Sequence, residues 1–243
     1  VPVLFLSGNV RKDTCTAYLK KRNIHVRHYG LQEHNIAETY ESMTKMSAFI
    51  DYVDSVKHML QRAVSYATNG RPGPVWIDIP IDIQTAEIPE DSKGFSFYND
   101  VWHLPQSLLD NLKDAERPIV LAGMGIRQSG TVDQFVKFVT KYKLPFVTSY
   151  GAQDYLPYDH PLNMGTIGSR GTRFGNFAMQ NADLLLILGS SMNAGVIGYD
   201  PKQFSPQSKK IYVDVDQYEL IKEIVPVDLK VVAPLDVFFK EML

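Results

Sequence analysis

The sequence predicts an α/β fold with parallel sheets, on three observations. Short apolar runs typical of strands buried on both faces recur along the chain, most clearly over residues 183–190. Segments with helical periodicity alternate with these runs, as helices do between parallel strands. The composition, 44% hydrophobic and 21% charged residues, is that of an ordinary globular protein. Together these features favour one large or two smaller α/β units.

The first 84 residues are predicted to form one α/β unit. Strands are expected at residues 1–8 and 74–79, with 24–30 as a further short strand. Residues 54–68 are expected to form a helix that ends at the Asn69-Gly70 pair. One face of this helix carries the apolar side chains Val56, Met59, Leu60, Ala63, Val64 and Ala67.

A second α/β unit is predicted over residues 105–243. The stretch before it, 85–104, mixes charge, serine, glycine and isolated aromatics without a period, and is expected to be a linker along a surface. Helices of the second unit are predicted at 105–115, 131–143 and 174–182. Strands are predicted at 118–123, 145–151, 183–190, 210–216 and 229–233.

The net charge and the cysteine content limit which binding partners and which cellular compartment the sequence predicts. The net charge of −2 gives no indication of nucleic acid or an acidic membrane as a partner. A single cysteine, Cys15, excludes an internal disulfide framework and a cysteine-rich zinc site, and predicts a cytoplasmic protein. The six histidines show no metal-binding spacing. Because the chain opens on Val1 and a strand-like run, we expect it to be a trimmed piece of a larger protein.

Two glycine-rich segments are the candidates for ligand contact. GMGIRQSG (123–130) lies between a predicted strand and a helix, where free N–H groups favour an anion. Its spacing differs from the dinucleotide fingerprint, so a tight turn is the alternative. In MGTIGSRGTRFGN (164–176), the N–H groups of Gly171 and Thr172, with Arg170 nearby, would cradle a phosphate or carboxylate. The alternative there is a glycine-rich crossover with solvated arginines.

No complete catalytic set is visible from the residues alone. Asp78 and Asp82 lie four residues apart around a proline, and we interpret them as anchors of turn geometry. His34 is interpreted as structural or interfacial.

The order of several motifs resembles thiamine-diphosphate-dependent enzymes of the acetolactate synthase type. The matching phrases are SGNV, YGLQEHNI, MTKMS, GRPGPVWIDIPIDIQ, PIVLAGMGI, LPFVTSYGAQDYLPYDHPLNMGTIGSRGT, NADLLLILGS and IYVDVDQYEL. The resemblance implies three α/β domains. One binds the pyrimidine ring of the cofactor, one is the central domain, and one binds the diphosphate. Residues 1–84 would be the C-terminal part of the pyrimidine-binding domain, and 105–243 a doubly wound, Rossmann-like central domain.

The resemblance also implies an activity for the parent protein. The parent would use thiamine diphosphate and magnesium to decarboxylate a small-molecule 2-keto acid and pass the fragment to an acceptor, as a homodimer or homotetramer. The family's activating glutamate and its G-D-G…N magnesium motif have no counterpart here, so this chain alone is expected to be inactive. A stand-alone nucleotide-binding or regulatory module is the alternative. An NAD-binding domain is disfavoured because the G-x-G-x-x-G fingerprint is missing.

Site residues carried over by the resemblance fall into two groups. The expected substrate-binding residues are Asn9, Gln32 and Lys45. The expected cofactor-binding residues, at the segments where the family holds a structural FAD, are Gly123, Gly125, Gly168, Arg170, Gly171 and Thr172. No residue of this chain is expected to be catalytic or to bind a metal.

FAD itself is disfavoured, because three arginines of the family pattern are replaced. The family's R-F-D-D-R-V-T-G corresponds to residues 191–198 here, where neither arginine is present. Glu41 stands where the third arginine is expected. A carboxylate in place of a cation near a diphosphate repels it by a few kcal/mol at close range.

Overall fold

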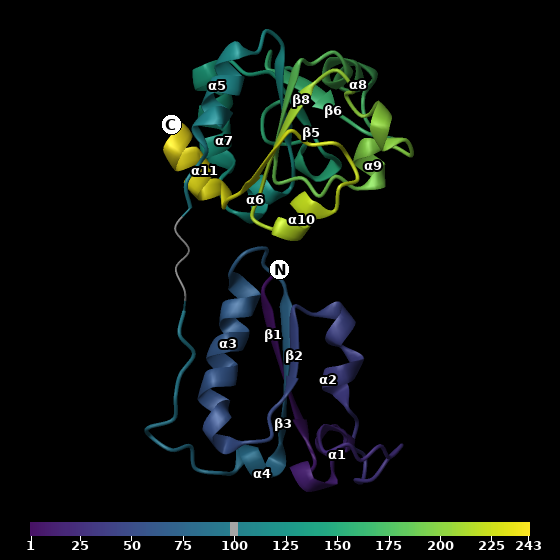
Figure 1. The fold of residues 1–243 in the computed structure, drawn as a ribbon, viewed down its shortest axis with the longest axis vertical. Coiled ribbons are helices and arrows are strands. Elements are labelled where there is room, and N and C mark those ends of the chain that lie inside the picture. The colour runs from purple at the N-terminus through teal and green to yellow at the C-terminus, as the bar shows by residue number, and fades with distance from the viewer. Residues whose placement is uncertain (98–101) are drawn as a thin grey trace. The chain divides into compact units, whose positions relative to one another are not determined.

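The protein divides into two compact units, Val1–Asn99 and Asp100–Leu243. The structure is a computed structural model that describes residues 1–97 and 102–243 (Figure 1). Each unit contains one parallel sheet flanked by helices, which confirms the predicted α/β class. The predicted linker 85–104 includes residues that lie outside the described ranges, and its boundaries stay a prediction.

The first unit is built on a three-stranded parallel sheet in the order β1-β3-β2. Its strands are β1 (Val3–Asn9), β2 (Met46–Phe49) and β3 (Pro74–Pro80). Its helices are α1 (Thr16–Lys21), α2 (Ile36–Thr39), α3 (Val56–Thr68) and α4 (Ile81–Gln84). The helix α3 buries Ala63 and Ala67 against β3, as predicted, whereas Val64 lies exposed. Burial of this apolar face holds α3 on the sheet.

Two short segments of the first unit differ from the prediction. Residues 24–30 do not form a strand, although Ile24 and Val26 alternate with polar residues. No neighbouring strand pairs with them in the described residues, and both side chains stay exposed. The strand β2 was not predicted, since the apolar and polar residues of its sequence MSAF neither alternate nor form a continuous apolar run.

The second unit is a doubly wound parallel sheet, as predicted, but it has six strands where five were predicted. Counted within the unit, its strand order is 3-2-1-4-5-6, the order of Rossmann-type folds. Its strands are β4 (Pro118–Ala122), β5 (Phe146–Thr148), β6 (Asn163–Thr166), β7 (Leu184–Leu188), β8 (Lys209–Asp214) and β9 (Leu229–Val232). Its helices are α5 (Gln106–Asp114), α6 (Gly125–Gln128), α7 (Val132–Tyr142), α8 (Arg173–Gln180), α9 (Ala194–Ile197), α10 (Gln217–Ile221) and α11 (Leu235–Met242).

Helices cover both faces of this sheet (Figure 1). On one face, α5, α7 and α11 pack against alternate strand residues such as Val120 and Leu186. On the other face, α8, α9 and α10 pack against the intervening residues, such as Leu121 and Ile187. Strands buried on both faces explain why the apolar runs of this half are continuous rather than alternating.

The strand β6 lies where a glycine-rich loop was predicted. Its residues Gly165 and Thr166 belong to the segment interpreted as an anion cradle, yet they lie in a strand in which Thr166 pairs with Thr148 of β5 across an irregular register. Glycine is rare in strand interiors, so the sequence pattern hid this sixth strand. No helix in the described part of the chain is both long and apolar enough to cross a membrane.

Candidate functional site

The point where the chain reverses its winding lies between β4 and β7 of the second sheet. In open α/β sheets, ligands bind outside the carboxyl ends of the strands at such a point. The predicted cofactor residues Gly123 and Gly125 follow β4, directly at this point. The others lie in the segment 168–172 after β6, two strands away and so about 10 Å across the sheet. The fold therefore places both groups along one sheet edge.

Gly123 and Gly125 serve close packing between the two central strands. A Cβ atom at Gly123 would lie 2.1 Å from the carbonyl oxygen of Gly189. The Gly123 N–H donates to the Leu188 carbonyl at 2.9 Å, and the Gly125 N–H donates to the Gly189 carbonyl at 2.8 Å. Both donors are thus used inside the protein, as the tight-turn alternative requires.

The segment after β6 is also held by its own backbone. Gly168 has a φ of +95°, and a Cβ there would lie 2.1 Å from the Gly195 carbonyl oxygen. The Gly171 N–H donates to the Gly168 carbonyl at 2.9 Å, and the Thr172 N–H donates to the Thr166 carbonyl at 2.8 Å. The predicted anion cradle from these two N–H groups was wrong, because neither donor is available.

Two arginines remain at this end of β6. Thr172 caps α8, its hydroxyl accepting from the Gly175 N–H at 3.1 Å, and the arginines flank this cap. Arg170 and Arg173 are exposed and form no hydrogen bond or ion pair with the described residues. They are the cations left for an anionic group at this edge.

Tyr155 is a residue of this region that the sequence analysis missed. Its buried hydroxyl donates to the Gly123 carbonyl at 2.9 Å and accepts from the Arg127 N–H at 3.2 Å. Burial raises the pKa of the Tyr155 phenol above its ordinary value. A neutral Tyr155 therefore fixes the loop after β4. Nothing in the local pattern separates it from the other tyrosines of the segment.

In the first unit, Asn9 ends β1 with its side chain fully engaged as a donor. Its amide Nδ2 donates to Asp78 Oδ2 at 2.7 Å and to the His34 carbonyl at 3.0 Å. Its Oδ1 accepts from the Val10 N–H at 3.0 Å. An asparagine amide has only two N–H donors, so Asn9 can offer a ligand one remaining lone pair. Its observed role is to join β1, β3 and the loop at His34.

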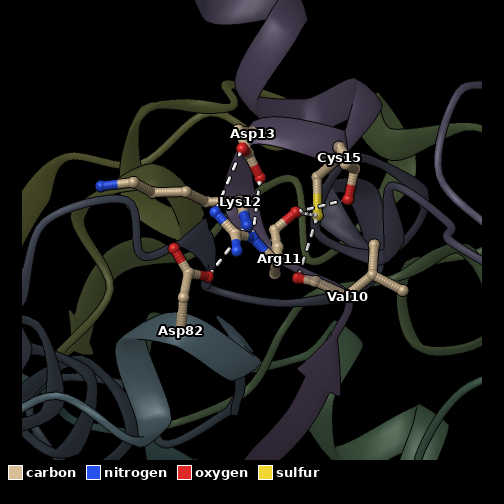
Figure 2. A network of polar contacts seen from close by, with 7 residues as sticks. Val10, Arg11, Lys12, Asp13, Cys15 and Asp82 are labelled. Atoms are coloured by element: carbon tan, nitrogen blue, oxygen red, sulfur yellow. Dashed lines mark hydrogen bonds and ion pairs between the residues drawn. The ribbon is translucent and has the colours of Figure 1, made fainter.

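Asp78 is the buried centre of this network. It is 1% exposed, and its Oδ1 accepts from the Ser7 hydroxyl at 2.7 Å. Ser7 in turn accepts from the Trp76 indole N–H at 2.9 Å. Asp82, four residues after Asp78, accepts from the Lys12 N–H at 2.9 Å and so holds the turn after β1 (Figure 2). These contacts agree with the interpretation of both carboxylates as structural anchors.

Gln32 lies close to Asn9 in the first unit. It is two residues before His34, whose carbonyl Asn9 binds, and it is exposed with a left-handed φ of +58°. A left-handed non-glycine residue is uncommon and marks a constrained loop.

Lys45 lies at the opposite end of the same sheet. Its backbone N–H pairs with Pro74 at the start of β3, whereas Asn9 is in register with Pro80 at the end. Six residues of strand separate the two positions by about 20 Å. The Lys45 ammonium donates to the carbonyls of Asn69 and Arg71, both at 2.8 Å. The structure therefore places Lys45 far from Asn9, whereas Gln32 lies in the loop that Asn9 binds through the His34 carbonyl.

Cys15 is expected to be unreactive in the folded protein. The thiol is buried and donates to the Val10 and Arg11 carbonyls at 3.4 Å each (Figure 2). Burial, with the nearby charge of Glu33, raises the pKa of the Cys15 thiol to about 12 from 9.0. At pH 8 a thiol reagent should react roughly 1,000-fold more slowly than in denaturant. Cys15 is the chain's one cysteine, so the reagent's absorbance reports it alone.

The same shift gives a pH dependence of stability. Since the folded pKa is raised, the folded state favours the neutral thiol. The contribution of the neutral Cys15 thiol to the free energy of unfolding is present below pH 9 and is lost as pH rises from 9 towards 12. Fast labelling of Cys15 in native buffer at pH 8 would contradict the slow thiol reaction predicted above.

Comparison with known proteins decides the family. Residues 106–242 match the model of the thiamine pyrophosphate enzyme central domain. The chain belongs to this family.

Similar proteins include a probable acetolactate synthase large subunit of Methanocaldococcus jannaschii, 30% identical over 205 residues (80% of this chain, 34% of the relative). The acetolactate synthase large subunit of Lactococcus lactis is 31% identical over 221 residues (88% and 38%). A probable acetolactate synthase 2 of Oryza sativa is 35% identical over 206 residues (81% and 31%). The chain thus spans about a third of the length of these relatives.

The residues present here do not fit the magnesium-diphosphate group that the resemblance implies for the parent protein. No G-D-G occurs in the sequence. Across residues 1–97 and 102–243, no group of three or more His, Cys, Asp or Glu side chains is arranged to hold a metal ion. In this thiamine pyrophosphate enzyme chain, no chemical step is therefore assigned to a bound metal.

The segment 191–198 also has few cations nearby that could bind a flavin diphosphate. The side chain of Asn193 caps α9, accepting from the Gly195 N–H at 3.0 Å, and Met192 is buried. Lys222 donates to the Ser191 carbonyl but is also paired with Glu219. The segment offers carbonyls and neutral side chains rather than the two lost arginines.

Proposed function

We propose that the protein carrying this chain is a thiamine-diphosphate-dependent enzyme that decarboxylates a 2-keto acid and joins the fragment to an acceptor. The observation that supports it most is the extent of the similarity. Alignments of 205 and 221 residues to acetolactate synthases are longer than the 106–242 central-domain match. The similarity therefore includes part of the first unit as well as the second.

The two units have different parts in this proposal. The second supplies the central domain, and the first supplies the C-terminal part of the pyrimidine-binding domain. Thiamine diphosphate supplies the stabilised carbanion on which such carboligations depend. The chain's own residues position the parts: Asn9 and Asp78 order the carboxyl end of β1, and Tyr155 orders the loop after β4. We place the activating glutamate and the magnesium ligands outside this chain, in a homodimer or homotetramer.

FAD is absent from the proposed enzyme. The family's flavin-binding arginines are replaced at residues 191–198 and at Glu41. The N–H groups of Gly123, Gly125, Gly171 and Thr172 are used by the protein's own carbonyls. A dianionic diphosphate left with too few cations and donors would bind weakly.

A nucleotide-binding or regulatory module is the second candidate function. Arg170 and Arg173 favour it, because two cations without partners among the described residues lie at the carboxyl edge of a doubly wound sheet. In this case, a phosphate would be bound by arginine side chains rather than by the glycine N–H groups.

Activity and binding measurements separate these functions. With thiamine diphosphate and magnesium, the longer polypeptide that carries this sequence should release CO₂ from pyruvate or another 2-keto acid, and this chain alone should not. Calorimetry of the chain with FAD tests the proposed absence of FAD. Calorimetry with ADP tests the nucleotide-binding function. Lack of cofactor-dependent turnover by the longer polypeptide on a panel of 2-keto acids would overturn the enzyme proposal. Turnover by the chain alone would refute the assignment of the catalytic parts.

A further inference from the structure

A cavity of about 420 Å³ opens in the first unit. Its walls come from α1, the coil segment 24–28, residues 33–35 and α2. A volume of this size lies within the range of small-molecule sites. The segment 24–28 lies within the stretch 24–30 predicted as a strand, and it falls between the SGNV and YGLQEHNI motifs rather than within either.

The two carboxylates of the cavity both accept hydrogen bonds from the protein. Glu33, whose side chain is 2% exposed, accepts from the Thr16 hydroxyl at 2.9 Å, and its other oxygen lies 3.6 Å from His28 Nδ1. Glu38 is paired with Lys20 and accepts from the Asn35 amide at 2.8 Å. Their oxygens are therefore engaged by protein donors.

The donors of the cavity are in excess of its acceptors. Arg27 and His25 line it, and neither forms a hydrogen bond or an ion pair with residues 1–97 or 102–243. A guanidinium carries five N–H donors and no acceptor, in a fork that matches phosphate and carboxylate oxygens. Lys20 adds an ammonium with three donors, of which Glu38 takes one. With Lys20 paired to Glu38, the Arg27 guanidinium is the cation of the cavity that has no protein partner among these residues.

Part of the cavity wall is apolar. Ile24 and Val26 line it and are 48% and 43% exposed. An inorganic ion would leave these side chains in water, whereas a ligand with a short carbon chain would cover them.

We propose that this cavity binds a small organic anion, with its phosphate or carboxylate group on Arg27 and its carbon chain against Ile24 and Val26. The site lies outside the residues matched to the central domain. None of the predicted substrate or cofactor residues lines it.

Ligand titration of the whole chain by NMR tests the site. Butyl phosphate, butyrate and inorganic phosphate are the probes, and backbone amide shifts within residues 16–39 are the readout. We expect saturable shifts with a dissociation constant of about 1 mM or lower for one of the two butyl probes, and weaker binding of inorganic phosphate. Butyl phosphate and butyrate together identify whether the head group is a phosphate or a carboxylate.

Substitution of the anchor gives the decisive comparison. Arg27→Gln should weaken binding by about tenfold, the usual loss for a hydrogen-bonded charge. Lys57→Gln removes one positive charge from the exposed surface of α3, outside the cavity, and should leave the affinity unchanged. Absence of saturable shifts with all three probes would overturn the proposal. An equal loss in both variants would do the same, since it would show a general charge effect.

Discussion

Gly123→Ala is expected to lower the free energy of unfolding of the second unit by about 3 kcal/mol or more. The new Cβ would lie 2.1 Å from the Gly189 carbonyl oxygen and 2.5 Å from the Ser190 Cα. Both neighbours are backbone atoms of the loop after β7, so neither can turn away as a side chain would. Relief requires β4 and β7 to separate where the Gly123 N–H binds the Leu188 carbonyl. Chemical denaturation followed by far-ultraviolet circular dichroism measures the loss.

Gly130→Ala is the matched control for this substitution. Gly130 has a φ of +71°, and a Cβ there would meet no other atom within 4 Å, so only backbone strain opposes the change. We expect a cost of about 1–2 kcal/mol there, from the left-handed conformation alone. Equal losses in the two variants would refute the close-packing role of Gly123. A Gly123→Ala protein as stable as the parent would refute it as well.

The elements predicted well from the sequence are those whose apolar pattern is long enough to measure. The run that forms β7 is buried on both faces, and the apolar face of α7 repeats through Phe135 and Val139, so both signals are strong. The strands β2 and β6 have four residues each, and β6 contains a glycine. Their strand conformation comes from pairing with β3 and β5, which are distant in the sequence. Such pairing energy leaves no local periodicity to detect.

The site was less predictable than the fold because one residue type serves two purposes. A glycine after a strand allows either a phosphate or a neighbouring backbone to approach closely. Only the three-dimensional position of Gly189 shows that Gly123 and Gly125 accommodate backbone. The motif order likewise could not show that Lys45 and Asn9 lie at opposite ends of one sheet, because this depends on the register of β1, β2 and β3.

Asp78→Ala is expected to destabilise the first unit by about 3 kcal/mol. The carboxylate is buried and accepts from two side chains, Ser7 and Asn9. Its removal leaves both donors without an acceptor in a site that water does not reach freely, which costs more than a lost surface contact. Asp54→Ala, at an exposed carboxylate, is the control and should change stability by less than about 0.5 kcal/mol.

Asp78→Asn separates the hydrogen bonds from the volume of the side chain. The Ser7 hydroxyl can reverse and accept from the new amide, while Asn9 still finds the remaining oxygen, so we expect a loss of only about 1 kcal/mol. The Trp76 indole N–H, which donates to Ser7, should shift in the NMR spectrum of either variant. If Asp78 also orders the loop that carries Gln32, Asp78→Ala should speed amide exchange over residues 31–35, because Asn9 joins that loop to the carboxylate through the His34 carbonyl. Unchanged exchange there would confine the role of Asp78 to the sheet, and the conformation of Gln32 would then depend on the buried contact between Glu33 and Thr16.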